Sequence, residues 1–163
     1  MSKKGFEHDA LVCHVRHVNP RIEKHGEDDV LSVDVSLRLM MAEAGSEWDP
    51  VLADIAGDFA EQISELGSIV DRLPFSAAYE EHRVNFRAST TLLASLSHAE
   101  VNKFALDYED LGLTFRVQAS EVDGETVGAL SELIGTKVRV EITAMQGELE
   151  LDASEAEDAE LVE

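Results

Sequence analysis

Cysteine, basic residues and long apolar runs are scarce in this chain, and each scarcity excludes a class of protein. The single cysteine, Cys13, leaves no possibility of a disulfide within the chain. No apolar run approaches the roughly 20 residues that a membrane-spanning helix needs. Residues 1–9 are charged and lack the apolar stretch of a secretory signal. These absences predict a protein of the cytosol.

Acidic residues dominate the composition. The chain carries 13 Lys and Arg against 34 Asp and Glu, a net charge of −21. Eight of the acids, and no base, lie in residues 147–163: Glu148, Glu150, Asp152, Glu155, Glu157, Asp158, Glu160 and Glu163. The rest of the chain still has 26 acids against 13 bases. Because such a surface repels phosphate backbones and anionic lipid, we expect no binding to duplex DNA at physiological salt and none to a membrane. Three explanations of the acidity remain: a solvated surface, attraction of a basic protein partner, or mimicry of nucleic acid.

Alternation of apolar and polar residues predicts a series of strands. It is clearest where Leu31, Val33, Val35, Leu37 and Leu39 are separated by polar residues. Further strands are expected over residues 11–18, 83–88, 113–119 and 137–142, with a weaker candidate at 102–108. Strands with one buried face and one solvent-exposed face are typical of an antiparallel sheet. Because proline has no backbone donor, Asn19-Pro20 predicts the end of the first strand, and a long polar loop over residues 21–29 joins it to the second.

Two helices are expected between the strands. Asp49 and Pro50 favour a helix start. Apolar residues then recur every three or four positions: Leu52, Ile55, Phe59, Ile63 and Leu66. A shorter helix contains Val127, Leu130, Leu133 and Ile134 and is closed by Gly135.

The predicted fold class is α+β: an antiparallel β-rich single domain, sandwich or barrel-like, with one longer and one short helix. We expect the globular domain to span residues 10–151. A flexible leader at residues 1–9 precedes it, and a disordered acidic tail at residues 152–163 follows it.

Two stretches of the chain resemble a family of tailed-phage and prophage proteins. In the first, residues 19–37, a Glu-Lys-His-Gly-acidic loop precedes an alternating strand. The second consists of residues 113–118, followed by residues 130–135 and a charged alternating strand. The two stretches cover about a third of the chain. The family is uncharacterised, so the resemblance implies a phage origin and a β-rich domain, but no chemistry.

No catalytic residue and no cofactor is predicted, because the sequence lacks nucleophile-elbow, phosphate-loop and dinucleotide-binding motifs. Cys13, His14 and His17 are of types that bind zinc. On a strand, however, Cys13 and His17 share one face while His14 points away, and two ligands do not complete a tetrahedral site. We therefore predict no metal site, an inert Cys13 thiol and a protein that is not an enzyme.

An acidic loop is the predicted partner-contact segment. It contains Glu23, Lys24, His25, Gly26, Glu27, Asp28 and Asp29. Its carboxylates could attract a divalent cation or a basic partner, although their spacing does not match an EF-hand loop. The alternative is an ordinary solvated hairpin loop.

A basic stripe is the second predicted binding surface. Five bases fall on the polar faces of predicted strands: Arg83, Arg87, Arg116, Lys137 and Arg139. If those strands are neighbours, the bases line one face of the sheet, and Phe104 and Tyr108 add rings on which the bases of a single strand could stack. The alternative is that the bases pair with cross-strand acids such as Glu141.

Three functions are consistent with these features. The first is a non-enzymatic phage accessory protein of DNA replication or recombination, with a protein partner and weak affinity for single-stranded DNA. The second is an anti-defence DNA mimic that binds a host DNA-processing protein. The third is a minor virion or assembly protein.

Overall fold

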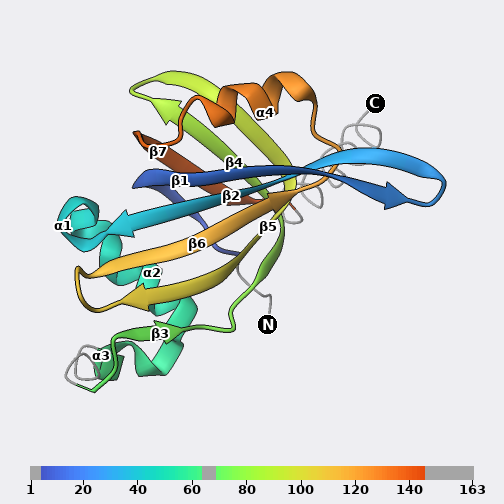
Figure 1. Ribbon diagram of the computed structural model, residues 1–163. Helices are drawn as coiled ribbons and strands as arrows, with labels where there is room; N and C mark the ends of the chain where they lie inside the picture. The colour runs from blue at the N-terminus through green and yellow to red at the C-terminus, as the bar shows by residue number, and fades with distance from the viewer. Residues whose placement is uncertain (1–4, 64–68, 146–163) are drawn as a thin grey trace, which may run out of the picture.

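The computed structural model describes residues 5–63 and 69–145, and this part of the chain contains seven strands: β1 (His8–His25), β2 (Asp28–Met40), β3 (Arg72–Pro74), β4 (Tyr79–Ala88), β5 (Thr91–Asp107), β6 (Gly112–Ala119) and β7 (Lys137–Ala144). They form one antiparallel sheet in the order β3-β5-β4-β7-β1-β2-β6 (Figure 1). β5 also pairs with β6, so the sheet closes on itself and leaves β3 outside the ring. The expected single antiparallel β-rich domain is confirmed.

Alternation places one face of each strand in the core. Val33, Val35, Leu37 and Leu39 of β2 are all fully buried, as the sequence pattern predicts. The same holds for most apolar residues of the predicted strands that became β4, β6 and β7, which face a common interior, while Ala88 at the end of β4 is exposed. Burial of this continuous apolar face holds the closed sheet together.

β5 closes the sheet because this one long strand pairs with both β4 and β6. Its first part pairs with β4, and its last part pairs with β6. The residues His98 and Lys103 have positive φ, and the register against β6 shifts between Asn102 and Ala105. Such bulges bend a strand and increase its twist. The sequence predicts only residues 102–108 of this strand, and it misses the three-residue β3.

The N-terminal boundary of the domain lies earlier than the sequence predicts. Phe6 is fully buried, with ring centroids 5.2 Å from both Tyr79 and Phe104. β1 begins at His8. A flexible leader over residues 1–9 is therefore wrong for residues 5–9, because a lone aromatic in a charged stretch gives no periodic signal of its burial. Residues 1–4 lie outside the described part.

The first hairpin also differs from its prediction. β1 runs straight through Asn19 and Pro20, and Pro20 pairs with Val33 of β2. The connection is a two-residue turn at Gly26 and Glu27, where Gly26 has φ 67°. β7 pairs with β1 as far as His14, and Gly135 and Thr136 bond to Val15, so among the described residues the edge of β1 is open only beyond Val15. Proline is tolerated on such an edge, which is why it does not end the strand.

The longer predicted helix is broken into two short pieces, α2 (Trp48–Ala56) and α3 (Ala60–Ile63), and an unpredicted helix, α1 (Met41–Ala44), precedes them. Trp48, Val51 and Ile55 of α2 are buried. Gly57, with φ 60°, ends α2, and Phe59 is 68% exposed rather than part of an apolar stripe. Asp49 makes no capping bond, because α2 already begins one residue earlier.

A short helix is confirmed as α4 (Gly124–Ser131), but it ends before Leu133 and Ile134, which the prediction includes. The Asp123 carboxylate accepts a hydrogen bond from Thr126 N–H, which caps its first turn. Leu130 is fully buried, and Gly135 follows with φ 87°. α4 lies at the top of the view in Figure 1, away from α1, α2 and α3 at the lower left. In the described part of the chain, no helix has the length and apolarity to cross a membrane. The expected tail at residues 152–163 lies outside the described residues.

Candidate binding surface

The strands β1 and β2 continue past the body of the sheet as a two-stranded arm, defined here as residues 19–32. β6 pairs with β2 only from Val33 onward, and β7 pairs with β1 only through His14. Within the described ranges, the arm strands therefore have only each other as ladder partners. Figure 1 shows the arm projecting to the right. All seven residues of the predicted partner-contact loop lie on it, at the strand ends and the turn rather than in a loop.

One face of the arm carries a fixed polar network. The Arg21 guanidinium donates to Glu23 Oε2 at 2.6 Å and lies 2.5 Å from Asp34 Oδ1. Ser32 Oγ donates to Glu23 Oε1 at 2.8 Å. These hydrogen bonds, from Ser32 first and then from Arg21, lower the pKa of the Glu23 carboxyl. The arm therefore presents an ionised carboxylate in a defined position at neutral pH.

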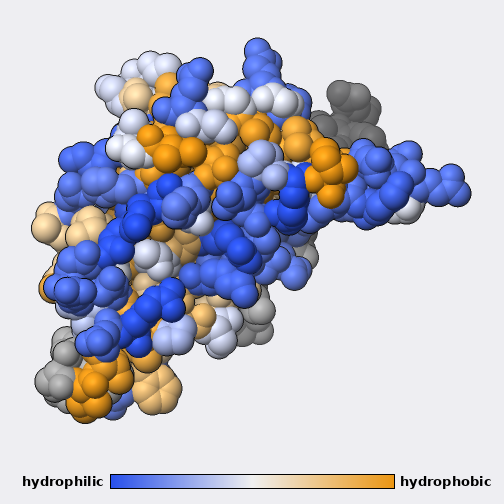
Figure 2. Space-filling model, viewed as in Figure 1, coloured by the Kyte–Doolittle hydropathy of each residue, from blue (hydrophilic) through white to orange (hydrophobic). Residues whose placement is uncertain are grey.

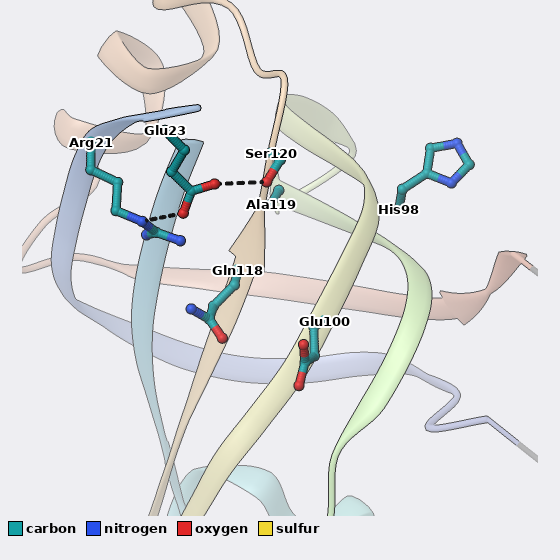
Figure 3. Close-up of a pocket in the computed structure, with 7 residues that line it drawn as sticks. All are labelled: Arg21, Glu23, His98, Glu100, Gln118, Ala119 and Ser120. Carbon is teal, nitrogen blue, oxygen red and sulfur yellow. Dashed lines mark hydrogen bonds and ion pairs between the residues drawn. The ribbon is translucent and has the colours of Figure 1, made fainter. Parts of the chain in front are cut away.

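A polar depression of about 210 Å³ lies where the arm meets the middle of β5 and the C-terminal end of β6. Figure 3 shows the side chains that line it: Arg21, Glu23, His98, Glu100, Gln118, Ala119 and Ser120. Asn102 Nδ2 donates to Glu100 at 2.9 Å and to Gln118 at 2.6 Å. Ser120 Oγ donates to Glu23 at 3.3 Å. The lining thus presents hydrogen-bond donors and acceptors that are held in place by one another.

The five predicted basic residues do not form one stripe. Arg87 of β4 lies directly opposite Arg139 of β7, and both contact the same carboxylate, Glu141, at 2.9 and 3.2 Å. Glu141 has a lowered pKa because of these contacts, first the one with Arg87. Lys137 contacts Glu43 at 3.2 Å, and Arg83 lies opposite Thr143. The alternative of cross-strand pairing with acids describes this surface better.

Arg116 lies apart from the other four bases. It is on β6, and β1 and β2 separate that strand from β7. Its Nη1 lies 3.9 Å from the Asp34 carboxylate. Only the order of the strands, which the residue pattern does not specify, separates it from the bases of β4 and β7.

The two predicted stacking rings are not freely exposed at the surface. Phe104 is buried and stacks on Phe115 with ring centroids 5.5 Å apart. The bulge at Lys103 turns Phe104 toward the core. Tyr108 is partly buried, and its hydroxyl donates to the Ile63 carbonyl oxygen. Phe104 therefore offers no surface for base stacking, and the binding role of the basic residues stays a prediction.

Cys13 is fully buried, and burial raises the pKa of its thiol. His14 points away from it and contacts Glu43 at 2.8 Å. His17 is exposed. Over residues 5–63 and 69–145, no three His, Cys, Asp or Glu side chains lie together as metal ligands would.

A second concavity, of about 710 Å³, was not predicted. It is lined by Gly5, Glu7, His8, Asp9, Glu47, Pro50, Ala53, Asp54, Ile142 and Thr143. His8 Nε2 lies 2.7 Å from Asp54 Oδ2. Four acids and no Lys or Arg contribute to this lining. The four acids come from three segments that are separate in sequence, so no local sequence pattern predicts the concavity.

Comparison with known proteins adds no relative: no protein-family model matches the chain, and neither a curated protein nor a solved structure matches it significantly. The fold and the surface geometry therefore define the class: a closed antiparallel β domain with a projecting arm.

Proposed function

We propose that this is a non-enzymatic, phage-encoded binding protein, an accessory of phage DNA replication or recombination that contacts another protein through the arm. The observation that carries the proposal is the arm itself, whose strands pair only with each other among the described residues. Two-stranded ribbons are marginally stable in water. A ribbon of this length, held by a polar network at its base, is better explained by contact with another protein than by a role in stabilising the fold.

The side chains favour a protein partner over nucleic acid. Arg87 and Arg139 share a carboxylate, and Phe104 is buried, so these three side chains are not free to hold a single strand. The arm tip exposes Glu27, Asp28 and Asp29. Exposed carboxylates suit a basic protein surface. The resemblance of residues 19–37 to tailed-phage proteins supports the phage setting and spans the arm.

The test is site-specific cross-linking of the full chain in phage-infected cells. A photoreactive amino acid at Glu27, in the arm turn, should form an adduct with a protein of DNA replication or recombination. The same amino acid at Thr90, in the turn between β4 and β5, is the matched control and should not. Adducts with virion proteins alone, or equal adducts from both positions, would contradict the proposal.

A shortened arm provides the second half of the test. Glu23 and Val30 are directly paired, so Asn-Gly in place of residues 24–29 closes the hairpin with a two-residue turn. This variant keeps the Glu23 network. It should fold normally and no longer co-purify with the protein identified by cross-linking.

A DNA mimic is the second candidate function. The net charge of −21 and the acidic concavity between the N-terminal segment and α2 favour it. A mimic occupies the DNA site of its partner. If duplex DNA competes with this protein for the cross-linked partner, the mimic is favoured over the accessory.

A further inference from the structure

The outer edge of β1 on the arm is open. β7 follows β1 through His14, and Val15 exchanges backbone hydrogen bonds with Gly135 and Thr136. No strand in the described part of the chain pairs with the outer side of residues 17–25, while their inner side pairs with β2 throughout. An extended edge of this kind is a template for a further strand.

An exposed apolar side chain lies next to this edge. Ile22 is 67% exposed and pairs with Leu31, which is half-buried. The two continue the row formed by Val18 and Val33, whose side chains are buried in the body. Figure 2 shows hydrophobic surface at the base of the arm and hydrophilic surface toward its tip. A strand added beside β1 would therefore bury an apolar side chain against Ile22.

The charges around the open edge of β1 indicate which kind of added strand would bind there. Glu27, Asp28 and Asp29 are exposed at the tip, and the Glu121 carboxylate lies beside His25 at 3.8 Å. Lys24 is already paired with Asp29, at 3.1 Å. Basic side chains on an incoming strand would meet these carboxylates.

A second copy of this chain fits the edge poorly. Antiparallel pairing of residues 17–25 with the same residues of another copy would set Arg21 opposite Arg21. Directly opposed like charges are destabilising. The charges therefore favour a different protein as the occupant.

We propose that the open edge of β1 over residues 17–25 accepts an extended segment of a partner protein as an added strand, with apolar side chains on Ile22 and basic side chains near the acidic tip. This strand-addition mode rests on the proposed function, because it specifies how the arm contacts its protein. Main-chain hydrogen bonds would supply affinity, and the alternating side chains would supply selectivity.

The test uses synthetic peptides as long as the edge and the full-length protein at physiological salt. A peptide of alternating Lys and Val should bind and slow amide hydrogen exchange at residues 17–25. Peptides of alternating Glu and Val, or of Lys and Ser, should bind at least about tenfold more weakly. The first comparison removes the charge match, and the second removes the apolar contact.

Ile22→Glu separates strand addition from simple charge attraction. It adds a negative charge, so charge attraction alone would tighten binding of the Lys-Val peptide. Strand addition on Ile22 predicts instead a loss of about tenfold or more. Leu92→Glu, at another exposed apolar position, is the matched control and should leave the affinity unchanged. Ile22→Ser, which adds no charge, should also weaken binding.

Three results would overturn this inference: no binding of the Lys-Val peptide, exchange protection confined to other residues, or unchanged or tighter binding by Ile22→Glu. If arm-dependent cross-links form despite such a result, the proposed function stands and only the strand-addition mode fails. If the peptide binds as expected but no arm-dependent partner exists in infected cells, the edge site stands and the proposed function fails.

Discussion

Phe6 and His82, 76 residues apart in sequence, are joined by a hydrogen bond in which the Phe6 backbone N–H donates to His82 Nε2 at 2.9 Å. The other ring nitrogen, Nδ1, lies 2.8 Å from the Glu80 carbonyl oxygen. A carbonyl can only accept, so Nδ1 carries the proton and Nε2 is the bare acceptor for Phe6. The contact therefore requires a neutral imidazole, and it ties the N-terminal segment to β4.

Acid should destabilise the protein through His82. Burial lowers the pKa of this side chain in the folded state, so the unfolded chain binds a proton more readily. The free energy of unfolding should therefore fall as pH decreases through the ordinary value of 6.5 and below. Denaturant titrations across this range measure the slope. His82→Gln should flatten it, while His17→Gln, at an exposed position, should not; an unchanged slope in His82→Gln would contradict the assignment.

Phe6→Ala should lower the free energy of unfolding by about 3–5 kcal/mol, because it removes a fully buried ring. Phe59→Ala is the control: this ring is exposed, and the expected change is within about 0.5 kcal/mol. Equal small effects of both substitutions in denaturant titrations would show that residues 5–9 are not part of the core.

The Cys13 thiol should not react with a disulfide reagent in the native protein. Its complete burial blocks access, and its raised pKa keeps it protonated. Reaction should appear only with unfolding, which makes Cys13 a reporter of global opening. A Thr90→Cys variant in a Cys13→Ala background should react at once. Comparable rates at the two positions would be incompatible with the buried placement.

Deletion of residues 152–163 should leave the free energy of unfolding within about 0.5 kcal/mol of the full chain. The segment contains few large apolar residues, and removing it deletes almost no surface that could be buried. Thermal and denaturant unfolding of both chains measure the difference. Loss of a cooperative transition in the shorter chain would disprove the prediction.

The protein should not hold duplex DNA at physiological salt, because its acids outnumber its bases. Single-strand binding should also be weak, since Arg87 and Arg139 are already paired with Glu141. Gel-shift titrations at low and moderate salt, with and without the tail, test both statements. The opposite result would be a higher affinity for single-stranded DNA after tail deletion that Arg87→Glu abolishes. It would indicate that the face formed by β4 and β7 binds nucleic acid.

The sequence by itself determined which residues face the core within most strands. Period-two alternation over residues 31–39, 113–119 and 137–142 predicts β2, β6 and β7, because an apolar face must be buried whatever lies opposite it. The acidic residues around Gly26, grouped from the sequence, lie together on the arm, and their contact with a partner stays a prediction.

Only the tertiary structure decided the features that depend on neighbours. Pro20 continues a strand because β7 stops at His14, and Phe6 is buried because Tyr79 and Phe104 surround it. Arg116 is separated from Arg139 by the order of the strands. The arm and the polar depression likewise exist only once β6 and β7 end before β1 and β2 do. Local sequence specifies periodicity and turn chemistry, whereas strand order, pairing length and bulges follow from packing among segments that are distant in the chain.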